Sequence, residues 1–157
     1  MGEELDVLKE ISGRIGYDES MPVCYYRKLR RLRTACIGRL VKELRAVKER
    51  NEIEKIKKAV KLTKKIFQNL EIGRTEIETA RNLKISILKK AEIAFEPIVA
   101  AGKNGFYVHH RPAKSSIKSP LLIDFGIKVD HYCSDFTRTI CLKNDRKILE
   151  FMHGQRE

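Results

Sequence analysis

The stretch LLIDFGIKVDHYCSDFTRT, residues 121–139, places two aspartates, Asp124 and Asp135, in a segment otherwise rich in apolar, aromatic and β-branched residues. Residues of these kinds favour strands. Two such runs separated by Asp130 and His131 predict an antiparallel hairpin with a tight turn. The fold of the chain and the purpose of the two carboxylates therefore depend on how this hairpin pairs.

The predicted pairing places the carboxylates on one face of the hairpin. Counting outward from the turn, Val129 pairs with Tyr132 and Asp124 pairs with Thr137. Asp135 lies two residues before Thr137, and alternate residues of a strand share a face. Diagonal neighbours lie within about 7–8 Å at the backbone, so the two carboxylates can converge on a metal ion or a pair of ions. Such oxygen ligands suit Mn²⁺, Co²⁺, Zn²⁺ or Fe²⁺ when other donors join them.

A second interpretation of the same spacing assigns no ligand to these aspartates. In it the carboxylates lie on a solvated face, while four apolar residues pack together on the other face. These residues are Ile123, Phe125, Phe136 and Ile140. A half-buried strand shows the same alternation whether or not its polar face binds metal, so the spacing alone leaves both interpretations open.

The remaining segments predict a mixed α+β chain. Thr75 and Glu78 have the spacing of a capping box, in which Thr75 Oγ accepts from the Glu78 N–H and the Glu78 carboxylate reaches back. A stripe on the preceding helix is predicted to be buried, comprising Ile53, Ile56, Val60, Thr63, Phe67 and Leu70. The predicted order is a helix at 3–12, a strand at 14–19, a helix from Pro22 to 33, a strand or turn leading to a short helix at 36–48, helices at 51–70 and 75–90, a β-compatible segment at 93–105, the hairpin, and a helix beginning near 145.

The chain is basic, with 33 Lys and Arg residues against 21 Asp and Glu residues and a formal charge of +12. The segments YYRKLRRLR (25–33) and KIKKAVKLTKK (55–65) concentrate this charge. A basic surface raises nucleic acid as a partner. Amphipathic helices with solvated lysine faces explain both segments as well, and this is the favoured interpretation.

Composition also bears on the compartment of the protein. No apolar run approaches the roughly 18 residues of a membrane-spanning helix, and the N-terminal sequence MGEELDVLKE is acidic, unlike a secretory signal. A cytoplasmic location and no membrane partner are expected. The four cysteines, Cys24, Cys36, Cys133 and Cys141, form no C-x-x-C pair, and they are expected to be reduced thiols with no role beyond packing.

The string IDFGIKVDHYCSDFTRTI resembles the metal-binding hairpin of the creatinase/prolidase family of metallopeptidases. This family has the pita-bread fold and includes Xaa-Pro aminopeptidases, prolidases and methionine aminopeptidases. Further segments match in order, among them ELRAVKERNEIEKIKKAVKLT, GRTEIETA and AFEPIVAAGKNGFYVHHRP. The resemblance is greatest to the Xaa-Pro branch. It implies the N-terminal half of a pita-bread fold in residues 49–157, preceded in residues 1–48 by a remnant of the N-terminal α/β domain and a linker.

The resemblance implies a role for each of four residues. Asp124 and Asp135 are implied metal ligands of a dinuclear centre, with Mn²⁺ or Co²⁺ as the expected ions. His109 falls where the family has a histidine that binds substrate and stabilises the tetrahedral intermediate. Thr137 is the implied hydrogen-bond partner that orients a ligating carboxylate. No family role is assigned to His110, which is interpreted as a loop residue.

The family centre also needs a histidine and two glutamates, which come from the second half of the fold. His153 lacks the glycine-rich surroundings of the family's ligand and is not assigned. The expected function is therefore that of an incomplete Xaa-Pro metallopeptidase, inactive alone. It would hydrolyse the bond between an N-terminal residue and proline if a second chain or a homodimer supplied the missing ligands. The alternative is a non-enzymatic pita-bread module that binds RNA or another acidic partner.

Overall fold

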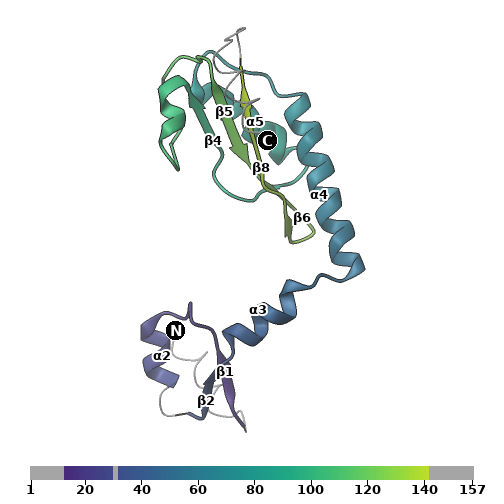
Figure 1. Ribbon diagram of the computed structural model, residues 1–157, viewed down its shortest axis with the longest axis vertical. Helices are drawn as coiled ribbons and strands as arrows, with labels where there is room; N and C mark the ends of the chain where they lie inside the picture. The colour runs from purple at the N-terminus through teal and green to yellow at the C-terminus, as the bar shows by residue number, and fades with distance from the viewer. Residues whose placement is uncertain (1–12, 30–31, 142–157) are drawn as a thin grey trace, which may run out of the picture. The chain divides into compact units, whose positions relative to one another are not determined.

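The computed structural model describes residues 13–29 and 32–141 (Figure 1). The helices predicted at 3–12 and near 145 lie outside these described residues, as does His153. Among the described helices, none is long and apolar enough to cross a membrane.

The chain divides into two compact units, residues 1–49 and 50–157. In the first unit, strands β1 (Ile15–Tyr17) and β2 (Thr34–Cys36) pair in parallel. Helix α2 (Val23–Leu29) lies between them in sequence, as a parallel pair requires a crossover, and α3 (Gly38–Ala46) follows β2. The predicted strand, helix and strand-to-helix order is confirmed.

The second unit packs two helices against antiparallel strands. Its three-stranded sheets have the orders β4-β5-β8 and β3-β6-β7, and all pairings are antiparallel. Figure 1 shows α4 and α5 beside the strands that they cover. The elements are α4 (Arg50–Gln68), α5 (Glu76–Leu88), β3 (Glu92–Ile93), β4 (Ile98–Ala101), the 3₁₀ helix η1 (Gly102–Phe106), β5 (Leu121–Phe125), β6 (Ile127–Val129), β7 (Tyr132–Cys133) and β8 (Phe136–Ile140).

The hairpin has the predicted register. Asp124 pairs with Thr137 in β5 and β8, and the β6–β7 pairing closes on a two-residue turn. The turn residues Asp130 and His131 have φ values of 50° and 69°. Two successive positive φ angles are those of a type I′ turn, which matches the twist of the flanking strands. Aspartate and histidine tolerate this conformation better than most residues.

Gly126 separates β5 from β6 at a point where no side chain fits. A Cβ there would collide with the carbonyl oxygen of Ser134 and with the ring of Phe95. The pairings on either side of this glycine, Phe125 with Phe136 and Lys128 with Cys133, have the same register. The glycine therefore helps to keep the two aspartates on one face.

The core lies between the helices and the apolar face of the hairpin. The rings of Phe67 and Phe125 both contact Phe136, with centroid separations of 5.2 and 5.7 Å. The predicted packing of the apolar hairpin residues is confirmed, since Ile123 and Phe125 are fully buried and Phe136 and Ile140 pack against them. The buried residues of this core cluster are Ala59, Ile66, Ala80, Leu83, Ile87, Val99, Ala101, Leu121, Ile123, Phe125 and Ile127.

The buried side of α4 confirms the predicted stripe except at its start. Thr63 is buried and Phe67 and Leu70 pack against the core, whereas Ile53, also predicted to be buried, is 41% exposed. In the first turn the neighbouring residue, Glu52, faces the hairpin, where its Oε1 accepts a hydrogen bond from Tyr132 Oη at 2.8 Å. The difference from the predicted stripe is therefore confined to the first turn of the helix.

The start of α5 confirms half of the predicted capping box. Thr75 Oγ1 accepts a hydrogen bond from the Glu78 N–H at 3.2 Å. The Glu78 carboxylate instead accepts from the N–H of Arg74, the residue before the cap, at 2.7 Å. The cap nevertheless satisfies one of the N–H groups that a helix start leaves without a partner.

The cysteines are free thiols, as predicted. Cys24, Cys36 and Cys133 are exposed and Cys141 is half-buried. The three exposed side chains therefore lie outside the core.

Candidate functional site

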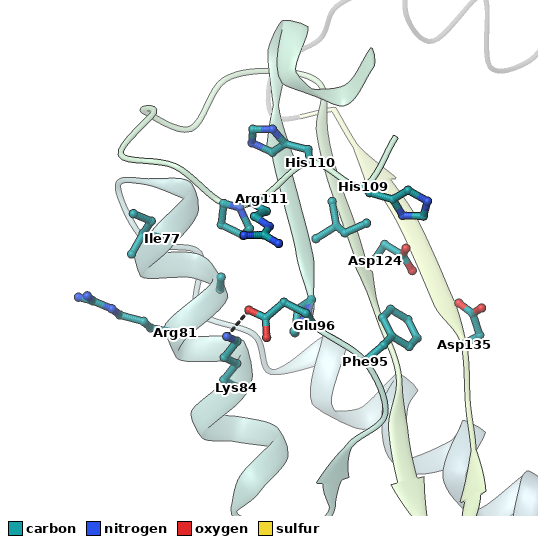
Figure 2. Close-up of a pocket in the computed structure, with 14 residues that line it drawn as sticks. Ile77, Arg81, Lys84, Phe95, Glu96, His109, His110, Arg111, Asp124 and Asp135 are labelled. Carbon is teal, nitrogen blue, oxygen red and sulfur yellow. Dashed lines mark hydrogen bonds and ion pairs between the residues drawn. The ribbon is translucent and has the colours of Figure 1, made fainter. Parts of the chain in front are cut away.

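The two hairpin aspartates lie on the same side of the sheet. Figure 2 shows Asp124 on β5 and Asp135 directly before β8, both on the side that His109 occupies. Asp124 is half-buried and Asp135 is exposed. Thr137 Oγ1 donates a hydrogen bond to Asp124 Oδ1 at 2.9 Å. A hydroxyl in this place holds one carboxylate oxygen and leaves the other free to face the cavity.

An open cavity of about 850 Å³ joins these residues. Asp124, Asp135 and His109 line one part of it, and Arg81 and Lys84 of α5 line another. Lys84 forms an ion pair with Glu96 (Figure 2). The cavity therefore presents carboxylates on the strand side and cationic side chains on the helix side.

The donors at this site fit part of a metal centre. Asp124 and Asp135 supply the oxygen ligands that hard and borderline divalent ions accept. Among residues 13–29 and 32–141, no group of three or more His, Cys, Asp or Glu residues is arranged to hold a metal ion. Two carboxylates leave most coordination positions to solvent, so further donors are needed for a tight site.

His109 has a backbone conformation that non-glycine residues rarely adopt. Its φ is 62°, and its side chain is exposed at the edge of the cavity. A left-handed conformation costs a residue with a Cβ about 1–2 kcal/mol. Such conformations persist where neighbouring contacts hold the backbone in place, and they occur often at functional sites.

The neighbouring His110 binds a buried carboxylate. Its Nε2 lies 2.9 Å from Glu76 Oε2, and the two side chains are 14% and 0% exposed. Because an ionised carboxylate only accepts hydrogen bonds, the proton of this pair lies on His110 Nε2. The interpretation of His110 as an ordinary loop residue is therefore incomplete, because its ring ties the loop to the first turn of α5.

Hydrogen bonds keep Glu76 charged inside the protein. Burial of the Glu76 carboxylate raises its pKa, but hydrogen bonds from two side chains and two backbone N–H groups favour the charged form more strongly. The net effect holds the pKa of Glu76 below its usual value of 4.5. A buried, fully hydrogen-bonded charge of this kind is a strong structural constraint.

The sequence prediction missed Glu76 altogether. An acidic residue in the first helical turn is ordinarily explained by the helix dipole, and residues 76 and 78 are both acidic. The structure distinguishes them, because Glu76 faces the core and Glu78 faces the cap. One signal for it was present in the sequence. The segment from Lys103 to Lys118 contains two histidines and several hydrogen-bond donors but no acidic residue to accept from them.

Comparison with known proteins places this geometry in a family. Residues 54–155 match metallopeptidase family M24. The chain belongs to this family. The match includes α5, the His109 loop and the whole hairpin, so the M24 region contains every residue of the candidate site.

Individual M24 proteins and similar structures support the assignment. An uncharacterized peptidase of Methanocaldococcus jannaschii is 36% identical over 116 residues, which cover 69% of this chain and 33% of that protein. The X-Pro aminopeptidase of Thermotoga maritima has a TM-score of 0.83 at 28% identity, covering 97% of this chain and 48% of that one. The prolidase of Pyrococcus furiosus has a TM-score of 0.79 at 26% identity, covering 97% and 49%.

These similarities establish the fold as well as the family. The chain is α+β and corresponds to the N-terminal half of the pita-bread fold of M24 prolidases and aminopeptidases, preceded by a smaller N-terminal fragment. It spans about a third of the length of the M. jannaschii relative and about half of the solved structures. M24 proteins are metallopeptidases, so divalent metal ions are the expected cofactors of the complete site.

Proposed function

We propose that this chain contributes half of the active site of an Xaa-Pro metallopeptidase. The substrate is a peptide with proline in the second position, and the reaction hydrolyses the bond between the N-terminal residue and that proline. The observation that carries the proposal is the placement of Asp124, Asp135 and His109 around one cavity. The similarity to X-Pro aminopeptidase and prolidase structures supports the choice of substrate class.

Each residue of the site has a distinct role in this proposal. Asp124 and Asp135 hold the metal ions, with Mn²⁺ or Co²⁺ preferred. Thr137 holds Asp124 in one orientation through its 2.9 Å hydrogen bond. The ring of His109 is exposed at the cavity, where it can donate a hydrogen bond to the scissile carbonyl oxygen and stabilise the charge that develops there.

The proposal requires donors beyond those described. When bound, a pair of divalent ions supplies the Lewis acidity and water activation that a hydrolase needs. Because the described residues bring no third donor to the two aspartates, we propose that the remaining ligands come from a second chain, from a second copy of this chain or from further sequence. The 157-residue polypeptide is expected to be inactive without them.

The two units have separate parts in this proposal. Residues 1–48 represent the end of an N-terminal α/β domain with its linker, and residues 49–157 represent the first part of the peptidase domain. The parallel β1–β2 pair with an intervening helix supports the first assignment. The position of Asp124, Asp135 and His109 supports the second.

Metal binding by the aspartates is tested with Mn²⁺ and the full chain. Mn²⁺ is expected to broaden the amide signals of Thr137 and Gly126 in the NMR spectrum, since paramagnetic broadening detects even weak binding. Asp124→Asn and Asp135→Asn should each abolish this effect. Asp130→Asn is the matched control, because Asp130 pairs with Lys58 at the hairpin turn and does not line the cavity. Equal broadening in all three variants would refute the metal site.

Catalysis is tested with an Xaa-Pro dipeptide and Mn²⁺ or Co²⁺. The chain alone should show no turnover. Mixing it with the C-terminal half of the T. maritima enzyme should restore hydrolysis, and Asp124→Asn should remove it again. Robust turnover by the chain alone would overturn the requirement for further ligands.

A further inference from the structure

The loop that carries His109 has few contacts in its middle. It runs from η1 to Ala113, and its central residues Phe106, Tyr107 and Val108 are 87%, 66% and 84% exposed. Its internal backbone hydrogen bonds are short-range ones, such as that from the His110 N–H to the Tyr107 oxygen at 3.2 Å. Apolar packing therefore does little to hold this loop, and its position depends on its two ends.

One buried carboxylate binds both ends of the loop. Glu76 Oε1 accepts from the Ala101 N–H at 2.7 Å and from Asn104 Nδ2 at 2.9 Å, at the beginning of the loop. Glu76 Oε2 accepts from His110 Nε2 at 2.9 Å and from the Ala113 N–H at 3.0 Å, at its end. The carboxylate thus joins two segments of the loop to the first turn of α5.

The position of these bonds matters for His109. His110 is directly bonded to Glu76, and the positive φ of His109 turns the chain between the anchored residue and the exposed centre of the loop. The two adjacent rings therefore have different surroundings: His110 binds the buried carboxylate, while His109 is exposed at the cavity beside Asp124 (Figure 2). Hydrogen bonds to a charged acceptor are stronger than neutral ones, so they can offset the backbone strain at His109.

We propose that Glu76 is a positioning residue, whose buried carboxylate fixes both ends of the His109 loop and thereby sets the place of the His109 ring beside Asp124 and Asp135. The consequence for catalysis rests on the proposed function. The fixing of the loop by Glu76 does not depend on the proposed function, and it can be measured separately.

The first experiment measures the order of the loop in the full chain. Glu76→Gln keeps the shape of the side chain but replaces one acceptor oxygen with an NH₂ group, so one end of the loop loses its partner. Trypsin should cut after Lys103 faster by on the order of tenfold, and the amides of Ala101 and Ala113 should exchange faster with solvent.

Two control variants separate this effect from a general loss of stability. Glu78→Gln lies on the same helix turn and neutralises only the carboxylate that accepts from the Arg74 N–H. Ile87→Val trims a fully buried residue of the same helix. Both should leave the cleavage rates in the loop unchanged, as should any variant that destabilises the unit without releasing the loop.

A second readout locates His109 itself. With Mn²⁺ and histidine-labelled protein, the His109 ring should be broadened together with the Thr137 amide in the wild type. In Glu76→Gln the Thr137 effect should remain while the His109 effect weakens. A folded Glu76→Gln variant with unchanged loop protection and unchanged His109 broadening would overturn the proposal.

Two other outcomes are also decisive. If Thr137 is not broadened in the wild type, the proposed metal site fails, and the trypsin and exchange rates still decide whether Glu76 fixes the loop. If Glu76→Gln does not fold, Asn104→Ala and His110→Phe take its place, since each removes a partner from one end of the loop. Faster cleavage in both supports the proposal, and wild-type protection in both refutes it.

Discussion

The two units differ in how much apolar surface each buries by itself. In the second unit, Leu83, Ile87 and Phe125 are 0% exposed. In the described part of the first, Leu29 is the only large apolar residue in the buried class, while Leu44 and Val47 are 72% and 83% exposed. A two-stranded sheet is marginally stable in water. The comparison teaches that the second unit has a core of its own, whereas the described part of the first buries little apolar side-chain surface.

Separating the units is the strongest test of this difference. The fragment 50–157 should unfold cooperatively on heating, because its helices and strands share one core. The fragment 1–49 should show no cooperative transition. Circular dichroism of the two fragments and the full chain measures this directly. A sharp transition in the shorter fragment would break the comparison.

The next largest difference is expected between the stability changes caused by truncating a core residue and a surface residue. Phe125→Ala should destabilise the second unit by about 3–5 kcal/mol, since it removes a fully buried ring and leaves a cavity. Leu44→Ala should change stability by no more than about 0.5 kcal/mol, because most of that side chain is already in solvent. Urea unfolding of the full chain compares them, and similar losses in the two variants would contradict the assignment of the core.

Removal of one hydroxyl from a buried pair should have a smaller effect on stability. Thr63 Oγ1 lies 2.6 Å from Ser134 Oγ and also donates to the Ala59 oxygen at 2.9 Å. Thr63→Val keeps the shape but should cost about 1–3 kcal/mol, because it removes the hydroxyl that bonds to the buried Ser134 Oγ and to the Ala59 oxygen. The same change at the exposed Thr139 is the control and should have almost no effect in the same urea assay.

The charge of Glu76 predicts a dependence of stability on pH. Its pKa is lower in the folded state, so its contribution is complete above its usual pKa of 4.5 and is lost as pH falls through the folded-state value. The melting temperatures of the wild type and Glu76→Gln should therefore differ most near neutral pH and converge as the pH is lowered below 4.5. Parallel curves would show that Glu76 is not the group responsible.

We expect the first unit to bind nucleic acid only weakly. Tyr25 and Tyr26 lie beside Arg27 and Lys28 on α2, and the chain has a formal charge of +12. Labelled RNA is expected to bind only in the non-specific range, roughly 10⁻⁴ to 10⁻⁶ M, and to be released by salt. Fluorescence anisotropy at two salt concentrations measures this. Tighter binding at physiological salt would favour an RNA-binding module instead of a peptidase.

The hairpin shows how much the sequence could predict. Its register follows from local information, because a two-residue turn at Asp130 and His131 determines every pair outward to Asp124 and Thr137. The alternation of apolar and polar residues then assigns the two faces. The side of the sheet that carries the aspartates was predictable for this reason.

Contacts between distant segments explain what was missed. Glu76 lies 34 residues before His110, and nothing in the local pattern of α5 distinguishes an acidic residue that faces the core. The exposure of Ile53 was missed for the same reason, because in the first turn of α4 it is Glu52 that bonds to the hairpin, to Tyr132, 80 residues away. Helical periodicity predicts the stripe, but it does not show which residue of a first turn faces a distant segment.

The Ser134 hydroxyl also has a consequence for folding accuracy. It accepts from the Ile127 N–H at 3.1 Å and reaches Thr63 on α4, so it connects the pairing of the strands to a helix. Shifting the strands by one residue would turn Asp135 and Thr137 toward the apolar side and take Ser134 away from both partners. A mispaired hairpin would therefore lose these hydrogen bonds in the core. The Ser134 hydroxyl thus selects the strand register that the site requires.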